Sequence, residues 1–98
     1  QRFTESFIRS RINRGLGQMR IERELKEKGI DQDLIEQSFA VEIDWFELAY
    51  ECGLRKFRSL DLYDYKEKQK AFRYLAYRGF SMDQIHFAVE HYLELQKS

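Results

Sequence analysis

Proline is absent from the 98-residue sequence, which also has only five glycines and one cysteine. Many-stranded β proteins need the tight turns and protected edges that glycine and proline supply, so this composition favours helices. The single cysteine, Cys52, cannot form a disulfide within the chain. No segment approaches the roughly 18 consecutive apolar residues of a membrane span. The sequence therefore predicts a soluble, cytoplasmic protein without a membrane partner.

An excess of charge of either sign is also lacking, because 17 basic residues balance 17 acidic ones. The charges nevertheless fall into blocks. Residues 1–30 carry eight basic and four acidic side chains, and residues 31–51 carry seven acidic and no basic ones. Residues 52–80 carry eight basic and three acidic side chains. Such blocks create local fields that the zero sum hides, and they suit a partner that itself presents alternating charge.

Apolar residues recur at helical spacing along nearly the whole chain, as in Phe3, Phe7 and Ile8. This periodicity predicts an all-α protein with six helices. The apolar residues that define these helices fall within residues 3–12, 21–28, 34–39, 45–52, 65–78 and 85–93. The first of these patterns begins without a capping residue, so we expect the sequence to belong to a longer parent chain.

Three of the expected helices have a recognisable start. Asp31, Asp44 and Ser81 can each accept a hydrogen bond from the first turn of a helix, and each is flanked by an apolar pair that can close over it. Glu47 and Gln84 follow the last two caps by three residues. This spacing predicts a reciprocal capping box at both sites.

The sequence contains an internal repeat with a period of fifty residues. The shift aligns Leu25 with Leu75 and Gly29 with Gly79, and both glycines stand where a helix is expected to end with a positive φ. We therefore expect two tandem three-helix units, residues 1–42 and residues 43–98, forming an elongated helical array.

Specific runs within both units resemble the RecX family, bacterial regulators of the recombinase RecA. The first unit resembles the central repeat of that family through FIRSRINRGLG at residues 7–17 and through Ile21, Leu25 and Gly29. The second resembles the last repeat through DWFELA at residues 44–49, KEK at residues 66–68 and RGFS at residues 78–81. The chain departs from the family in lacking its first repeat and in having Gln18 where proline is common.

The resemblance implies a modular protein that lies along the groove of the RecA nucleoprotein filament. It further implies that such a protein restrains filament assembly and activity, and so acts in homologous recombination, DNA repair and the SOS response. Catalysis, a metal and a cofactor are not implied.

Catalytic and metal-binding motifs are scarce. His86 and His91 are five residues apart, which does not align them on one face of a helix as metal ligands. Cys52 falls on an apolar stripe and is expected to be buried and unreactive. The Gly15–Leu16–Gly17 segment follows a helix and lacks the lysine of a phosphate-binding loop, so a helix-connecting turn is favoured. These patterns predict a protein that is not an enzyme.

Basic stripes are the candidate binding site. Lys66, Lys70, Arg73 and Tyr77 fall within about 60° of one another on one face of a helix. A solvated face explains such a stripe equally well, and Tyr74 or Tyr77 could either stack on bases or pack beneath lysine stems. The predicted partner-binding or phosphate-binding residues are Arg9, Arg11, Arg14, Arg20, Arg55, Lys56, Arg58, Lys66, Lys70, Arg73 and Arg78.

Three functions remain open from the sequence. The first is a monomeric modulator of the RecA–DNA filament that acts sterically, with DNA phosphates as auxiliary contacts. The second is a helical module that binds bare DNA, although such modules usually carry a net basic charge. The third is a structural adaptor for another protein.

Overall fold

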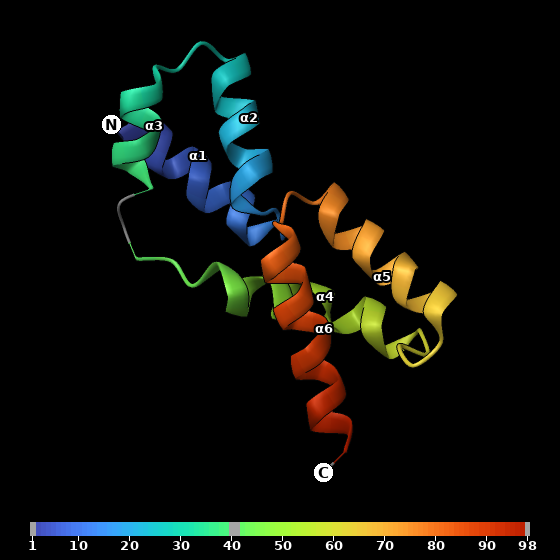
Figure 1. Ribbon diagram of the computed structural model, residues 1–98. Coiled ribbons are helices and arrows are strands. Elements are labelled where there is room, and N and C mark those ends of the chain that lie inside the picture. The colour runs from blue at the N-terminus through green and yellow to red at the C-terminus, as the bar shows by residue number, and fades with distance from the viewer. Residues whose placement is uncertain (1, 40–41, 98) are drawn as a thin grey trace.

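The protein consists of six α-helices and short connections (Figure 1). The computed structural model describes residues 2–39 and 42–97, with the backbone alone for Arg2. The helices are α1 (Arg2–Asn13), α2 (Gln18–Glu27), α3 (Gln32–Ser38), α4 (Trp45–Arg58), α5 (Tyr65–Tyr77) and α6 (Met82–Gln96). No strand occurs in these residues. The predicted all-α class and the six helices are therefore confirmed.

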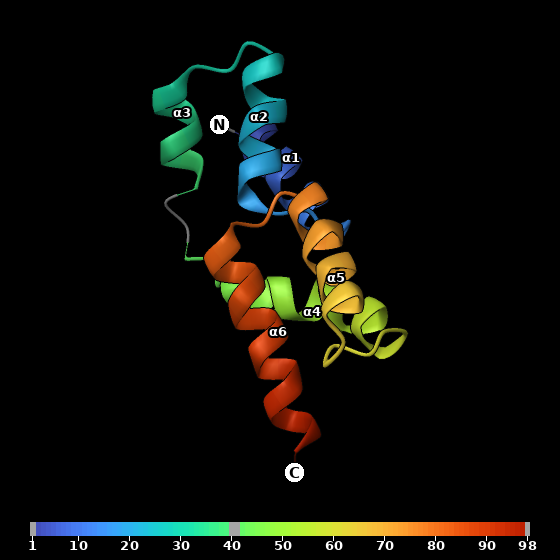
Figure 2. The same ribbon diagram turned by 45° about the vertical axis from the view of Figure 1, so that its right-hand side comes forward.

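The helices form two groups of three. Helices α1, α2 and α3 contact one another, as do α4, α5 and α6, and the two groups lie one beyond the other in both views (Figures 1 and 2). The molecule measures 44 × 23 × 19 Å. Its radius of gyration is 14.7 Å, compared with about 13 Å for a compact domain of this length. The predicted elongated array of three-helix units is confirmed.

Each group has its own hydrophobic core. The first core is small and centres on Ile21, Leu25 and Ile35, all fully buried. The second is larger because α4 and α6 pack along each other, and it includes Phe57 and further residues of α5 and α6. Trp45, at the start of α4, packs against both cores. The indole therefore reports on the environment of both units.

Helix starts largely follow the sequence signals. Asp31 accepts a hydrogen bond from the backbone of Asp33, and Ser81 forms the complete predicted capping box with its partner three residues on. The predicted box at Asp44 is only half formed: its carboxylate accepts the Glu47 N–H at 3.0 Å, and among the described residues no return bond from Glu47 is made. One cap was not predicted. Asp64 accepts the N–H of Glu67 at 3.2 Å and caps α5.

Candidate partner-binding site: a basic hollow at the joint between the units

The start of α2 is the joint between the two groups of helices. This helix begins after Gly17 without a side-chain cap. The Gly17 N–H instead donates to the carbonyl oxygen of Arg78 at 2.7 Å, and the Met19 N–H donates to that of Gly79 at 3.1 Å. The first N–H groups of any helix lack partners within the helix. Here the turn between α5 and α6 supplies those partners.

At this joint the main chains of the two units are in direct contact. A Cβ atom placed on Gly17 would lie 2.5 Å from the carbonyl carbon and oxygen of Gly79. Only glycine lets two main chains approach this closely. Gly15 has φ of 82°, so it provides the positive φ that ends α1. The two glycines of the predicted helix-connecting turn therefore serve different purposes.

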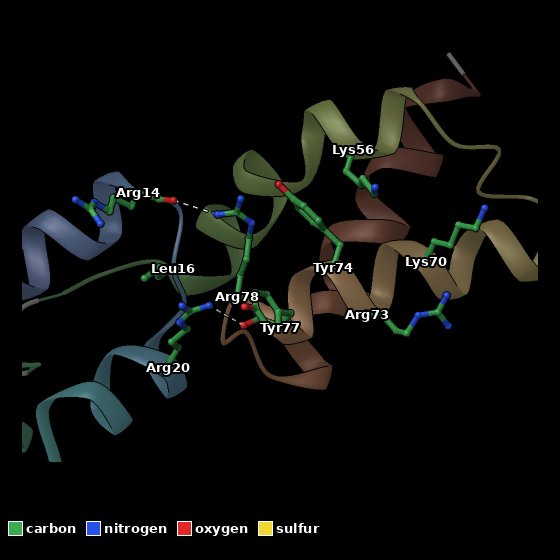
Figure 3. Close-up of a pocket in the computed structure, with 9 residues that line it drawn as sticks. All are labelled: Arg14, Leu16, Arg20, Lys56, Lys70, Arg73, Tyr74, Tyr77 and Arg78. Carbon is green, nitrogen blue, oxygen red and sulfur yellow. Dashed lines mark hydrogen bonds between the residues drawn. The ribbon is translucent and has the colours of Figure 1, made fainter. Parts of the chain in front are cut away.

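Two arginines fasten the joint. The Arg78 guanidinium donates to the carbonyl oxygen of Arg14 at 3.1 Å (Figure 3). It also donates to the carbonyl oxygen of Gly15 at 3.4 Å. The Arg20 guanidinium donates to the carbonyl oxygen of Tyr77 at 3.3 Å. Both arginines were predicted to bind a partner, and the structure gives each of them a role in holding the units together.

A hollow of about 670 Å³ lies over the joint. Arg14 and Arg20 border it at the end near the first unit, and Lys70 and Arg73 border it along α5 (Figure 3). The complete lining is Arg14, Leu16, Arg20, Lys56, Lys70, Arg73, Tyr74, Tyr77 and Arg78. None of these residues is acidic, so the electrostatic potential in the hollow is positive. Residues from both units, and from both basic blocks of the sequence, are needed to build it.

Charge in the hollow is only partly neutralised. Lys70 pairs with Glu67 at 3.2 Å across one turn of α5. Arg14, Lys56 and Arg73 form no salt bridge with any other residue that the structure describes. Their charges are therefore available to an anionic ligand.

The two tyrosines of the hollow differ in their surroundings. Tyr74 lies between two cations, with the Arg78 guanidinium 4.8 Å and the Lys56 ammonium 5.5 Å from the ring centroid. This is the arrangement in which a tyrosine packs beneath basic side chains. Tyr77 is 77% exposed, with the Arg20 guanidinium 5.1 Å from its ring centroid. Of these two tyrosines, only Tyr77 has a ring surface open to a stacking partner.

Arg11 belongs to a separate cluster within the first unit. Its guanidinium donates to Glu24 at 2.8 Å and lies 4.2 Å from the ring centroid of Phe7. Glu24 also pairs with Arg20 at 3.3 Å. Burial by itself raises the pKa of Glu24, but the hydrogen bonds and charges of the two arginines outweigh it and leave this pKa below its ordinary value of 4.5. The Glu24 carboxylate thus links the Arg11 cluster to the joint.

The remaining predicted residues do not line the hollow. Arg9 lines a shallow depression on α1 that also includes Arg14. Arg55 and Arg58 are exposed on α4, and Lys66 is exposed on the first turn of α5. The structure therefore divides the predicted basic residues into a group around the hollow and a group outside it.

The two histidines, which were considered as metal ligands, do not form a metal site in the described residues. His86 packs edge-on against Phe72, and His91 contacts Tyr50 and Phe87. No group of three or more histidine, cysteine, aspartate or glutamate side chains there is placed to hold a metal ion. No helix in the described part of the chain is long and apolar enough to cross a membrane.

Cys52 is half-buried beneath the joint. Burial raises the pKa of its thiol, against the opposing charge of Arg78 and with a further rise from Glu51. A thiol with a raised pKa is mostly protonated at neutral pH and is a poor nucleophile.

Fold and site together define a tandem array of three-helix units with a basic surface at the joint. Two family models match this arrangement: "RecX, second three-helix domain" covers residues 1–38, and "RecX, third three-helix domain" covers residues 42–89. The chain belongs to the RecX family, as the sequence motifs predicted.

Curated relatives agree with this assignment. The chain is 43% identical over 94 residues to the regulatory protein RecX of Yersinia enterocolitica, a match that covers 95% of this chain and 56% of the relative. It is 46% identical over 86 residues to that of Serratia proteamaculans, covering 87% of this chain and 51% of the relative. The corresponding match in Legionella pneumophila is 46% over 85 residues, covering 86% and 57%. The chain thus spans about half the length of these relatives, which are named as regulatory proteins.

Proposed function

We propose that the chain is a non-catalytic regulator that binds the RecA–DNA filament along its groove and restrains filament assembly and activity. Membership of the RecX family supports the partner. The single observation that carries the proposed site is the basic hollow, which contains several cations and no carboxylate. We further propose that the chain acts as a monomer in the cytoplasm, with residues 1–42 and 43–98 as its two repeats.

The hollow favours an extended anionic surface as its ligand. Arg14, Lys56 and Arg73 have no salt-bridge partner among the described residues, so binding an anion does not first require an internal ion pair to break. A filament of protein wrapped around DNA presents carboxylates and phosphates together. The acidic block of residues 31–51 would be repelled by bare DNA and tolerated by such a mixed surface.

The mechanism that follows is steric. The hollow is built from both units, so a ligand bound there holds the two units against one surface of the filament. A molecule 44 Å long can contact more than one protomer of a filament. Bridging protomers in this way would alter filament growth and strand exchange without any chemistry by the regulator.

Fluorescence anisotropy tests this proposal. The labelled chain would be titrated with RecA filaments on single-stranded DNA, with RecA alone and with DNA alone. A Lys56→Glu/Arg73→Glu variant should bind the filament at least about tenfold more weakly. The matched control is Arg55→Glu/Arg58→Glu, which changes the net charge equally at exposed sites outside the hollow. Equal weakening by both variants would refute the hollow as the site, and no filament binding by the parent chain would refute the partner.

Binding to bare DNA is the second candidate function, and the exposure of Tyr77 favours it. An exposed ring beside several cations is a feature of proteins that bind single strands, where base stacking contributes about 1–3 kcal/mol per base. This function predicts equal affinity for naked DNA and for the filament, with a steep dependence on salt. The DNA-only titration distinguishes the two functions.

A further inference from the structure

The hollow at the joint has an aromatic part and a charged part along the same helix. Lys70 and Arg73 border it on α5, and Tyr77 stands one turn beyond Arg73 (Figure 3). The Tyr77 side chain is 77% exposed, whereas the ring of Tyr74 lies between two cations. Because an α-helix rises about 1.5 Å per residue, Lys70 and Tyr77 are separated by about 10 Å along the axis of α5. The hollow therefore offers one open ring with a row of cations beside it.

The positive charge of the hollow exceeds what neighbouring carboxylates neutralise. Six of its nine lining residues are cationic. Two of the six pair with carboxylates outside the lining, Lys70 with Glu67 and Arg20 with Glu24. The hydrogen bonds of the Arg78 guanidinium go to main-chain carbonyl oxygens, which carry no net charge. Four cations thus remain without a counter-charge among the described residues.

A nucleoside polyphosphate combines the two kinds of group that such a hollow can recognise. Its base is an aromatic plane, and any base can stack on a tyrosine ring. Its phosphates lie beyond a single sugar. In a triphosphate they carry about four negative charges at neutral pH, because the terminal phosphate alone carries about two. This charge matches the four cations that lack a counter-charge.

A strand of nucleic acid matches the hollow less well. Each phosphate of a strand carries about one negative charge, and successive phosphates are separated by a sugar. The one or two phosphates that the hollow can hold would leave part of its positive charge without a partner. The volume of about 670 Å³ instead lies within the range of about 300–1,000 Å³ that is typical of small-molecule sites.

The hollow is suited to bind such a ligand without hydrolysing it. Among the described residues that line it, none is acidic, so no carboxylate is available there as a general base or as a ligand for magnesium. A magnesium ion carried by the phosphates would offset the negative charge that the cations attract. We therefore expect tighter binding of the metal-free ligand.

We propose that the hollow is a binding site for a free nucleoside polyphosphate. The base stacks on the open face of Tyr77, and the phosphates lie among Lys56, Lys70 and Arg73. Arg14, from the turn after α1, completes the site from the first unit, so the site exists only while the joint is closed. The nucleotide would occupy residues that we assign to the filament and would compete with it. That consequence alone rests on the proposed function.

Calorimetric titration of the chain with ATP, without RecA or DNA, tests the aromatic part of the site. ATP should bind in EDTA and should bind more weakly in excess magnesium. Tyr77→Ala should weaken ATP binding at least about fivefold and leave the binding of inorganic tripolyphosphate unchanged, because only the stacking surface is removed. Tyr77→Phe keeps the ring and should bind ATP as the parent does. The matched control is Tyr63→Ala, at a tyrosine that is 68% exposed outside the hollow.

A second pair of variants tests the charged part. Arg73→Gln should weaken the binding of both ATP and tripolyphosphate at least about fivefold, whereas Arg58→Gln, at an exposed site outside the hollow, should change neither.

Three results would overturn the inference. The first is no binding of ATP at millimolar concentration, and a parent chain that still bound the filament would then leave the proposed function intact. The second is equal affinity of the parent and Tyr77→Ala for ATP, which would make the hollow a site for phosphate alone. The third is tighter binding of a short single-stranded oligonucleotide than of ATP, which would assign the hollow to nucleic acid.

Discussion

Alanine at position 17 tests the joint between the units. At φ −90° and ψ 170° an alanine is unstrained, so with free space around it the change would stabilise the protein by about 0.4–1 kcal/mol through the unfolded state. The space is absent, because the new Cβ would lie 2.5 Å from Gly79 and 2.7 Å from the nitrogen of Phe80. Two main chains must then separate. The close contact at the joint therefore makes the substitution destabilising instead of stabilising.

The size of the loss follows from the bonds that open. The N–H groups of Gly17 and Met19 lose their carbonyl partners, which costs about 2 kcal/mol for the pair at about 1 kcal/mol each. The bonds from Arg20 to Tyr77 and from Arg78 to Arg14 are exposed to solvent and add only about 1 kcal/mol in total. Subtracting the gain in the unfolded state leaves a net loss of about 2 kcal/mol. A domain of this size has about 5–15 kcal/mol in all.

Urea unfolding followed by Trp45 fluorescence gives the free energy of unfolding. Cys52 adds a local measure, because its sulfur lies 3.4 Å from where a Cβ on Gly15 would stand, so the α1–α2 turn covers it. Opening the joint should speed its reaction with a thiol reagent by about tenfold. The control is Gln18→Ala, since among the described residues the Gln18 side chain hydrogen-bonds only to Glu22, within the first unit. A Gly17→Ala protein as stable as the parent, with unchanged Cys52 reactivity, would refute the reasoning.

Three further outcomes are expected. Asp64→Ala should lower stability by about 1 kcal/mol through loss of the α5 cap, while Asp64→Asn should lose only a few tenths, as thermal unfolding would measure; equal losses would contradict the cap. Because the folded pKa of Glu24 is lowered, its contribution is present above the ordinary value of 4.5 and is lost as the pH falls through the lower folded value. Glu24→Gln should therefore flatten the acid side of the stability curve, and urea midpoints that fall with acid as steeply as in the parent would count against this. Filament binding should weaken with salt, and Lys56→Glu/Arg73→Glu should show a shallower dependence in the anisotropy titration; an unchanged slope would argue against an ionic role for the hollow.

Local signals in the sequence account for most of the fold. The helical spacing of apolar residues and the caps at Asp31 and Ser81 depend on neighbours within one or two turns, so both can be identified without tertiary contacts. Asp64 was missed because the residue four positions on is Lys68, so this aspartate lacks the flanking apolar pair that marks the three predicted caps. The capping box predicted at Asp44 is incomplete because spacing alone does not fix the rotamer of Glu47.

The candidate binding site was harder to predict from the sequence than the fold was. Basic residues of both units could be recognised as candidates, but the role of Arg78 depends on the carbonyl oxygens of Arg14 and Gly15, which are more than sixty positions away. One signal was present: α2 follows Gly17 with no capping side chain, which predicts that its first N–H groups find partners elsewhere. The identity of those partners required the structure.

The joint also bears on how the chain folds. Its bonds connect residue 17 with residue 78, and closing a loop of that length costs about 4 kcal/mol of chain entropy. Contacts within each unit close much shorter loops, so we expect the larger core of α4, α5 and α6 to form first and the joint to form after the rate-limiting step. Stopped-flow experiments should then show Gly17→Ala accelerating unfolding while the refolding rate is nearly unchanged; slower refolding would place the joint in the folding nucleus. On this view the glycine contact controls the lifetime of the assembled array, and therefore how long both units can hold one ligand together.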